Sequence, residues 1–462
     1  MRVRNACIAL PGATEPFRGE IIVEDGSIVA VGADLPCSGE DVDANGLLVL
    51  PGAIDPHVHF FDPGYPAKET FPTGSAAAAA GGVTTVIDMP DTSIPMATDG
   101  ASVREKRDAL ERRSVVDFGL FGGISGLLCD DALAARIAEM APLVCGIKTY
   151  ATSGADFFPR VNNYQYSQIL RLAKKHDVTI LVHAEDWDFV SHADADARAS
   201  GTTGKAFYSS RPEAAETLSV LSVTELAAAA GAEMHIVHLG TARAAAIVAM
   251  LANVTGETCP QYLEFDCNDL ERIGAPLKIT PTLKSPDQKV LLWQMLADGR
   301  IDFIASDHAP GTVQEKSADS IWDAYSGIPG GPIVFLYALS EGYLGGRLSL
   351  ARLVEVTSSA AARRYRLDDR KGAIAAGHDA DLVFVDPDAT TRFDAAASPS
   401  LGKVSPWDGH EFRGRVVRTM LRGKTVYDAD DGVVGEPGTG RFVAPRRQDR
   451  KEYRNGETPR DS

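Results

Sequence analysis

The stretch Thr179-Ile-Leu-Val-His183 is a short apolar run that ends in a polar residue, and this pattern is the main evidence for the fold class. Similar runs recur along the chain at Thr84-Thr-Val-Ile-Asp88, Gly146-Ile-Lys-Thr-Tyr-Ala151, Met234-His-Ile-Val-His238 and Ile301-Asp-Phe-Ile-Ala-Ser-Asp307. Segments rich in Ala and Leu lie between them and are predicted to be helices, at residues 74–80, 131–140, 168–176, 212–230 and 242–251. Continuous apolar strands separated by helices indicate a parallel sheet covered on both faces.

This alternation of strands and helices favours a (β/α)8 barrel of the TIM type over an open sheet. The repeating units fill residues 53–370, and no Gly-rich dinucleotide fingerprint follows the first strand. We therefore predict an α/β fold in which one barrel makes up most of the chain.

Both ends of the chain have the residue pattern of β-strands. Residues 20–32 read as two strands joined by an Asp-Gly turn, and strand-like runs return at residues 377–386 and 414–427. We expect residues 1–52 and 371–440 to pack on each other as a small composite β-sandwich domain. Residues 441–462 are charged and rich in Arg, so they are predicted to form a disordered tail.

The composition excludes several classes of protein. The 462 residues contain 46 Lys and Arg against 63 Asp and Glu, a net charge of −17, which argues against a nucleic-acid or anionic-membrane partner. There is no signal-peptide-like segment and no apolar run of the ~18 residues that a membrane span needs, so we predict a cytoplasmic protein. The six cysteines include no CxxC pair and are expected to be reduced.

The candidate chemistry begins at Asp55-Pro-His-Val-His59, because residues two apart on a strand project to the same face. His57 and His59 can therefore share a metal ion, although a buried histidine pair is the simpler alternative. Three later strand ends carry His183, His238 and Asp307, and the carboxyl ends of barrel strands converge on one pocket. Four imidazoles and a carboxylate suit Zn²⁺ or a similar divalent ion. His235 faces the other way and is predicted to be structural.

Lys148 lies in the apolar strand around residues 144–150, where an unpaired ammonium is costly to bury. One interpretation is a lysine salt-bridged near the end of its strand. The other interpretation is that a chemical modification removes the positive charge of Lys148.

The motifs resemble those of the cyclic amidohydrolases, a group that contains dihydroorotases, allantoinases and hydantoinases. Their order and spacing match over nearly the whole chain at Asp55-Pro-His-Val-His59, Gly146-Ile-Lys148, Val182-His-Ala-Glu185, His235-Ile-Val-His238 and Ala305-Ser-Asp-His-Ala-Pro310. The resemblance implies an enzyme that opens a cyclic amide or ureide ring by attack of a metal-bridging hydroxide. The implied partners are a small-molecule cyclic amide and further copies of the chain in a homo-oligomer.

The resemblance also implies a ligand set for two divalent ions, most simply zinc. His57, His59 and Asp307 would hold one ion, His183 and His238 the other, and Lys148, carbamylated by CO₂, would span both. Asp307 would also move the proton during catalysis.

Other side chains near these ligands have expected roles of their own. Tyr150 lies two residues after Lys148, on the same strand face, and is a candidate hydrogen-bond donor to the oxyanion. Glu185 is expected to be a partner of His183. His308 follows Asp307 and is placed near the pocket by analogy with the family.

The substrate is less well specified by these motifs. Dihydroorotases carry an arginine and an asparagine that hold the substrate carboxylate, where this chain has Phe61 and Asp91. Because Asp91 would repel an anion, an allantoin-, hydantoin- or dihydropyrimidine-like substrate is favoured. Phe61, Asp91, Tyr150 and His308 are the predicted substrate contacts. Dihydroorotase activity, a catalytically silent paralogue on the same fold and a mononuclear deaminase remain as alternatives.

Overall fold

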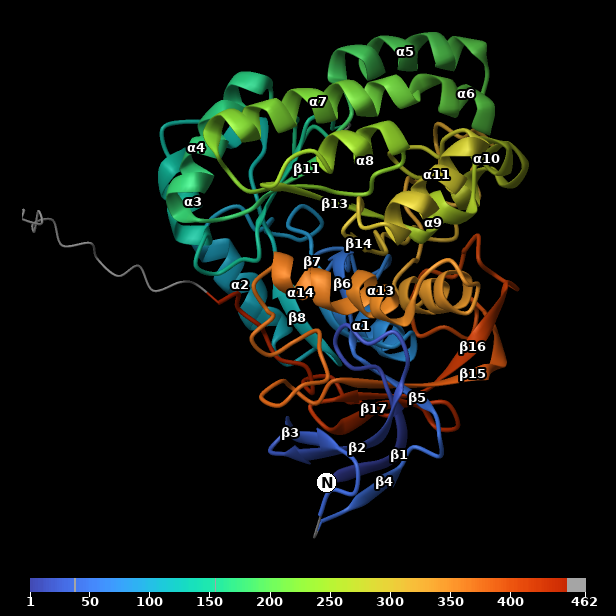
Figure 1. Ribbon diagram of the computed structural model, residues 1–462. Coiled ribbons are helices and arrows are strands. Elements are labelled where there is room, and N and C mark those ends of the chain that lie inside the picture. The colour runs from blue at the N-terminus through green and yellow to red at the C-terminus, as the bar shows by residue number, and fades with distance from the viewer. Residues whose placement is uncertain (37–38, 154, 447–462) are drawn as a thin grey trace, which may run out of the picture.

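The computed structural model describes residues 1–36, 39–153 and 155–446, and most of them form a parallel β-barrel surrounded by helices (Figure 1). With β8 and β9 counted as one interrupted strand, the barrel has eight strands. They are β6 (Ala53–Val58), β7 (Val83–Asp88), β8 (Asp117–Leu120) with β9 (Gly122–Gly123), β10 (Ile147–Tyr150), β11 (Ile180–His183), β12 (Met234–Ile236), β13 (Val254–Thr258) and β14 (Phe303–Ile304). The predicted (β/α)8 fold is confirmed.

Neighbouring barrel strands pair in parallel from β6 to β8 and from β9 to β14. A parallel bridge between Val58 and His308 brings the last strand back to the first and closes the barrel. Side chains alternate along each strand, which β10 illustrates. Thr149 faces outward and its hydroxyl accepts a hydrogen bond from Tyr166 of the covering helix, so Lys148 and Tyr150 face the inside.

The helices cover the outside of the barrel. Those that follow barrel strands are α1 (Phe71–Ala80), α2 (Gly100–Leu110), α3 (Leu133–Met140), α4 (Asn163–His176), α7 (Glu213–Ala230), α8 (Ala242–Val248), α11 (Pro286–Ala297), α13 (Leu350–Val354) and α14 (Ala360–Arg364). Additional short helices lie in the connections: α5 (Trp187–Ser200), α6 (Gly204–Ser210), α9 (Pro260–Glu264), α10 (Cys267–Ile273) and α12 (Val334–Tyr337). None of the helices in the described residues is long and apolar enough to cross a membrane.

The two ends of the chain form one mixed sheet of nine strands at the far end of the molecule from α5 and α7 (Figure 1). Its strands are β1 (Arg2–Ile8), β2 (Phe17–Glu24), β3 (Ser27–Gly32), β4 (Asp41–Asp43) and β5 (Leu48–Pro51), then β15 (Leu382–Arg392), β16 (Glu411–Leu421), β17 (Lys424–Asp428) and β18 (Gly432–Val433). Antiparallel pairing of β5 with β15 joins the two ends. Asp25 and Gly26, both at positive φ, form the predicted turn between β2 and β3.

A buried ion cluster ties this sheet to the barrel. The ammonium of Lys371 lies 2.6 Å from Asp117 of β8, 2.6 Å from Asp381 and 2.8 Å from Asp379. Arg422 forms a second ion pair with Asp117. These three carboxylates are close enough to hold a metal ion, but Lys371, Arg422 and Arg370 already form ion pairs with them.

The C-terminal segment departs from the expected disorder over its first residues. Arg441 and Val443 form backbone hydrogen bonds with Phe118 at 3.0 and 2.8 Å, and Val443 is 1% exposed. The ring of Phe442 packs edge-on against that of Phe118. The fold therefore extends to residue 446, because apolar side chains anchor this strand-like segment. Residues 447–462 of the predicted tail lie outside the described residues.

Candidate metal centre

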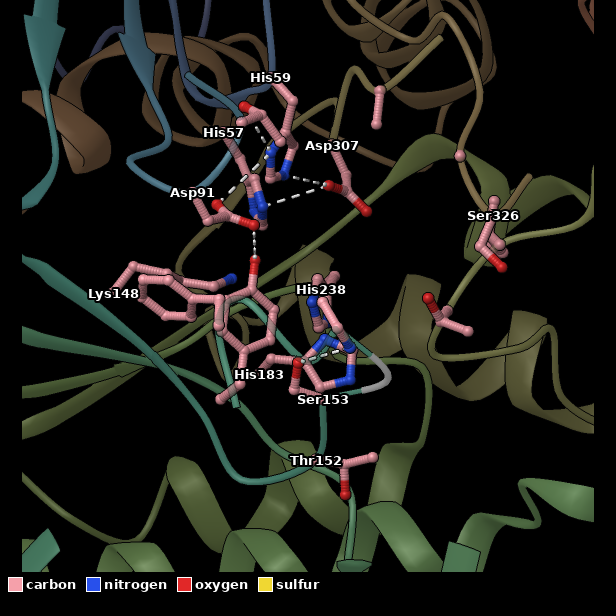
Figure 2. Close-up of a pocket in the computed structure, with 18 of the residues that line it drawn as sticks. His57, His59, Asp91, Lys148, Thr152, Ser153, His183, His238, Asp307 and Ser326 are labelled. Atoms are coloured by element: carbon pink, nitrogen blue, oxygen red, sulfur yellow. Dashed lines mark hydrogen bonds and ion pairs between the residues drawn. The ribbon is translucent and has the colours of Figure 1, made fainter. Parts of the chain in front are cut away.

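The carboxyl ends of the barrel strands bring all six predicted ligand candidates to one cavity of about 250 Å³ (Figure 2). Three lie within strands, His57 on β6, Lys148 on β10 and His183 at the end of β11. His238 and Asp307 lie just past β12 and β14 and both have positive φ, at 43° and 50°. Such backbone strain in residues other than glycine is typical of functional sites.

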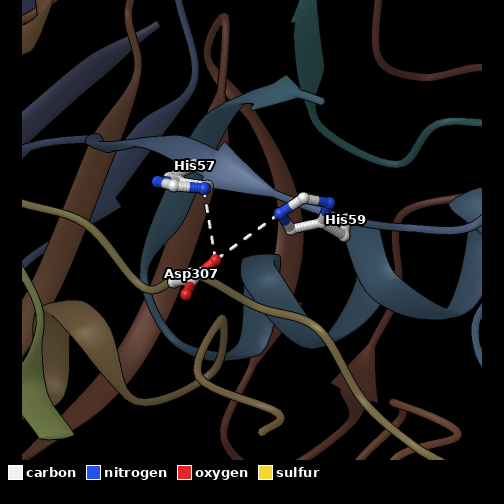
Figure 3. Close-up of side chains that lie close together, drawn as sticks. All are labelled: His57, His59 and Asp307. Atoms are coloured by element: carbon white, nitrogen blue, oxygen red, sulfur yellow. Dashed lines mark ion pairs between the residues drawn. The ribbon is translucent and has the colours of Figure 1, made fainter. Parts of the chain in front are cut away.

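His57, His59 and Asp307 form the first group of candidates (Figure 3). Oδ1 of Asp307 lies 3.2 Å from Nε2 of His57 and 3.5 Å from Nε2 of His59. One donor atom from each of the three residues falls within 4.8 Å of the others, which is the spacing a single ion requires. Burial alone would raise the pKa of Asp307, but the hydrogen bond with His59 and the nearby histidines lower it to about 2.

His183 and His238 form the second group, with ring centroids 4.7 Å apart. The ring of His57 lies 5.5 Å from that of His238, so the two groups adjoin. Figure 2 shows both groups on the wall of one cavity, with Lys148 beside them, and Tyr150 lines the same cavity. Four imidazoles and a carboxylate from the ends of four strands, β6, β11, β12 and β14, thus converge on a single space.

Lys148 is 1% exposed and lines the same cavity. Burial lowers the pKa of its ammonium, while the carboxylates of Asp307 and Asp91 oppose this effect. The charge of Lys148 in turn lowers the pKa of His57 and His238, after the larger effect of their own burial. A lowered pKa makes the neutral amine, the form that can react with CO₂, more accessible.

The donor set fits a divalent metal. Nε2 of His57 and Nδ1 of His238 are buried atoms without a hydrogen-bond partner, and buried polar atoms are rarely left so. Burial also lowers the pKa of both rings and favours the neutral imidazole that binds metal. Nitrogen and carboxylate ligands of this kind are those that zinc prefers.

Carboxylates hold the ring nitrogens that face away from the cavity. Oε2 of Glu185 lies 2.9 Å from Nε2 of His183, as the sequence predicted, and Arg211 forms an ion pair with the same oxygen at 2.5 Å. Burial would raise the pKa of Glu185, but Arg211 and His183 lower it to about 2. Glu257 has the corresponding position beside His57, with its Oε1 2.5 Å from Nδ1.

Glu257 and Arg211 are the two residues that the sequence interpretation missed. Glu257 lies on β13, whose run Val-Thr-Gly-Glu-Thr is too polar and short to be recognised as a barrel strand. Arg211 follows α6 in a connection without regular periodicity, and it lines the cavity. Neither residue lies at the end of an apolar run, which was the signal that identified the other candidates.

The predicted substrate contacts divide into two pairs. Asp91 and Tyr150 line the cavity, and the Tyr150 hydroxyl donates a hydrogen bond to Oδ2 of Asp91 at 2.9 Å. Burial and the charge of Asp91 raise the pKa of Tyr150 well above its usual value, so the hydroxyl keeps its proton.

Phe61 and His308 do not line the cavity. The ring of Phe61 stands 6.4 Å from that of His59 and 6.3 Å from that of Tyr325, which does line the cavity. His308 is fully buried, with Nε2 3.2 Å from Glu69 and Nδ1 accepting a hydrogen bond from Gly331. The expected placement of His308 at the substrate is therefore wrong, because its ring is held by Glu69 and Gly331 outside the cavity. The ring of Phe61 also packs edge-on against that of Tyr65 in the same loop.

His235 is structural, as predicted. It is buried and does not line the cavity. Its ring stacks on that of Phe303 at 5.0 Å, while its two nitrogens lie 2.8 Å from Thr255 and 3.2 Å from Glu257.

A closed (β/α)8 barrel with this cluster of nitrogen and oxygen donors at its carboxyl end has the architecture of a metal-dependent barrel enzyme. The family model described as "Amidohydrolase family" matches residues 48–426. The chain belongs to the amidohydrolase family, so it is a metal-dependent hydrolase of amide C–N bonds.

Similar proteins of known sequence cover nearly the whole chain. An allantoinase from Solibacter usitatus is 37% identical over 429 residues, covering 91% of this chain and 92% of the relative. A dihydroorotase from Halobacterium salinarum is 38% identical over 432 residues, covering 93% and 97%. Among solved structures, an L-hydantoinase (dihydropyrimidinase) from Arthrobacter aurescens has a TM-score of 0.91 at 30% identity, covering 96% and 99%.

Proposed function

We propose that this enzyme hydrolyses the ring of a neutral cyclic amide or ureide, with allantoin as the leading candidate and hydantoins and dihydropyrimidines as close alternatives. The charge of the cavity around the six ligand candidates carries the substrate assignment. The similarity to an allantoinase and an L-hydantoinase supports it.

In this proposal two zinc ions occupy the cavity. His57, His59 and Asp307 hold one ion, His183 and His238 hold the other, and Lys148 bridges them as a carbamate. Bound zinc would lower the pKa of water toward neutrality and polarise the substrate carbonyl. The carbamate forms when the neutral amine attacks CO₂ and releases one N–H proton, which replaces a buried cation with an anion that two cations can share.

Asp307 handles the proton in the proposed reaction. Its carboxylate faces the cavity with Oδ1 toward His57 and His59, so the second oxygen is available to a reacting group. It accepts a proton from the attacking water and returns it to the ring nitrogen that leaves, which avoids expulsion of an amide anion. The leaving nitrogen departs as a neutral amine or urea group.

The charged residues beside the ligand candidates favour a neutral substrate. Arg211 is compensated by Glu185, which lies 2.5 Å away. Asp91 has no lysine or arginine partner within ion-pair distance in the described residues, and its Oδ1 is a buried acceptor without a hydrogen-bond partner. An N–H group of a ureide would satisfy this oxygen, whereas a substrate carboxylate would be repelled by it.

The test is a hydrolysis panel on the zinc-loaded enzyme with allantoin, hydantoin, dihydrouracil, succinimide and dihydroorotate. We expect the highest kcat/KM on one of the four neutral rings. Dominant activity on dihydroorotate would contradict the charge argument. Failure to hydrolyse any cyclic amide, with zinc bound, would favour a catalytically silent relative. The cytoplasmic location and the homo-oligomer stay predictions.

A further inference from the structure

Glu257 is a carboxylate in the barrel interior that two histidines share. It is fully buried and lies on β13, the strand that pairs with β14. Its Oε1 lies 2.5 Å from Nδ1 of His57, and its Oε2 lies 3.2 Å from Nε2 of His235. Burying a carboxylate this deeply is costly unless its oxygens are hydrogen-bonded. The two histidine contacts offset this cost.

The contact with Glu257 determines which nitrogen of His57 faces the cavity. In its ionised form Glu257 can only accept a hydrogen bond, so the 2.5 Å contact then places the proton on Nδ1 of His57 and leaves Nε2 as the lone-pair atom. Nε2 is the atom that has no hydrogen-bond partner and lies 3.2 Å from Oδ1 of Asp307. The contact therefore selects the tautomer in which His57 presents its lone pair beside the Asp307 carboxylate.

His235 fixes Glu257 from the other side. Its Nδ1 lies 2.8 Å from the hydroxyl of Thr255, and its ring is stacked on Phe303. The carboxylate is thus held between one rigid ring that does not line the cavity and one that does. Glu185 has the same relation to His183, with Arg211 in the place of His235.

We propose that Glu257 is a positioning residue for the first metal subsite, acting through His57, just as Glu185 acts through His183 at the second. The inference rests on the proposed zinc centre, but not on the identity of the substrate. A hydrogen-bonded carboxylate behind a histidine ligand fixes the ring and raises its basicity, and removing one typically weakens metal binding 10- to 100-fold.

Zinc titration of the metal-depleted, full-length protein in the presence of bicarbonate tests the proposal without any substrate. In Glu257→Gln we expect one of the two zinc ions to bind about 10- to 100-fold more weakly, while the other binds as in the wild type. Glu216→Gln is the matched control, because Glu216 is equally buried but bonds only to backbone N–H groups and Lys284. It should leave both zinc affinities unchanged.

A double-mutant cycle separates positioning from a general structural role. If Glu257 acts through His57, adding Glu257→Gln to His57→Asn should cause no further loss of zinc affinity. An equal loss in both backgrounds, or an unchanged zinc affinity in the single variant, would overturn the proposal. A wild-type chain that binds no zinc would remove the metal centre and this role together, whereas failure of the substrate panel alone would affect only the substrate assignment.

If Glu257→Gln does not fold, the proposal can still be tested on the wild-type protein. Nitrogen-15 NMR of the metal-free protein, with the His57 signals identified by their loss in His57→Asn, reports which ring nitrogen carries the proton. We expect the Nδ1–H tautomer. The Nε2–H tautomer would contradict the proposed role.

Discussion

The hydroxyl of Tyr150 donates a hydrogen bond to Oδ2 of Asp91 at 2.9 Å, across the mouth of the cavity that holds the six ligand candidates. The two residues come from different barrel units, Tyr150 from the end of β10 and Asp91 from the segment after β7. The proton that a substrate oxyanion would need from Tyr150 is therefore engaged by a carboxylate. The pair is better suited to shaping the substrate site than to stabilising the oxyanion.

Tyr150→Phe tests this distinction. Loss of an oxyanion donor typically lowers kcat about 10²- to 10³-fold. Because the hydroxyl is already bonded to Asp91, we expect kcat to fall by less than about tenfold and KM to change at least as much. Steady-state kinetics on the best substrate of the panel measures both. A hundredfold loss in kcat at unchanged KM would restore the oxyanion role.

Asp91→Asn should change substrate preference. Removing the negative charge lifts the repulsion of a carboxylate and costs part of the interaction with a ureide N–H group. We expect the ratio of kcat/KM on dihydroorotate to that on allantoin to rise about tenfold, equivalent to about 1.4 kcal/mol. Asp186→Asn, at the exposed N-terminus of α5, is a control that should leave this ratio unchanged. An unaltered ratio in Asp91→Asn would remove Asp91 from specificity.

Lys148→Ala should remove metal and activity together. In the proposal the lysine carbamate is shared by both ions, so its loss weakens both subsites. Elemental analysis of the purified variant should find well under two zinc ions per chain, with no detectable hydrolysis. An active variant that retains two zinc ions would refute the bridge, and short-chain carboxylic acids added to the variant should restore part of the activity if a carboxylate is what is missing.

Lys371→Met should destabilise the protein by about 3–5 kcal/mol at pH 7, since it leaves buried carboxylates without their counter-ion. Urea unfolding measures the change. Lys424→Met, at an exposed position on β17, should have a small effect. A small effect of Lys371→Met as well would show that the ion cluster is not what joins the two domains.

The same cluster predicts a dependence on pH. Burial opposes the charge of Lys371, but Asp381 and Asp117 raise its pKa, so its stabilising contribution is complete below its unfolded pKa and is lost at more alkaline pH. Burial would raise the pKa of Asp117, but Lys371 and Arg422 lower it, so its contribution is lost as pH falls below about 4. The difference between wild type and Lys371→Met should therefore shrink in acid, as the unpaired carboxylates take up protons. A difference that stays constant from pH 7 to about pH 3 would contradict this expectation.

Much of the fold was predictable because apolar runs and helical stretches mark most of its strands and helices. The apolar run ending at His183 and the one containing Lys148 are strands β11 and β10, and residues 213–230 form the long helix expected at 212–230. The interpretation did not recognise β13, since a strand with Gly256 and Glu257 lacks the apolar run on which the prediction depends. The C-terminal anchor at Val443 was likewise hidden in a charged segment.

The donors that gather at the carboxyl ends of the strands could be identified from local patterns, because strand periodicity and parallel topology place the ends of all strands on one side. The residues that contact the far side of those donors were visible only in the folded molecule. The contact between His57 and Glu257 joins residues 200 positions apart, and the burial of His308 against Glu69 joins residues 239 apart. Such contacts depend on the relative rotation and packing of distant strands, which no local pattern of residues encodes.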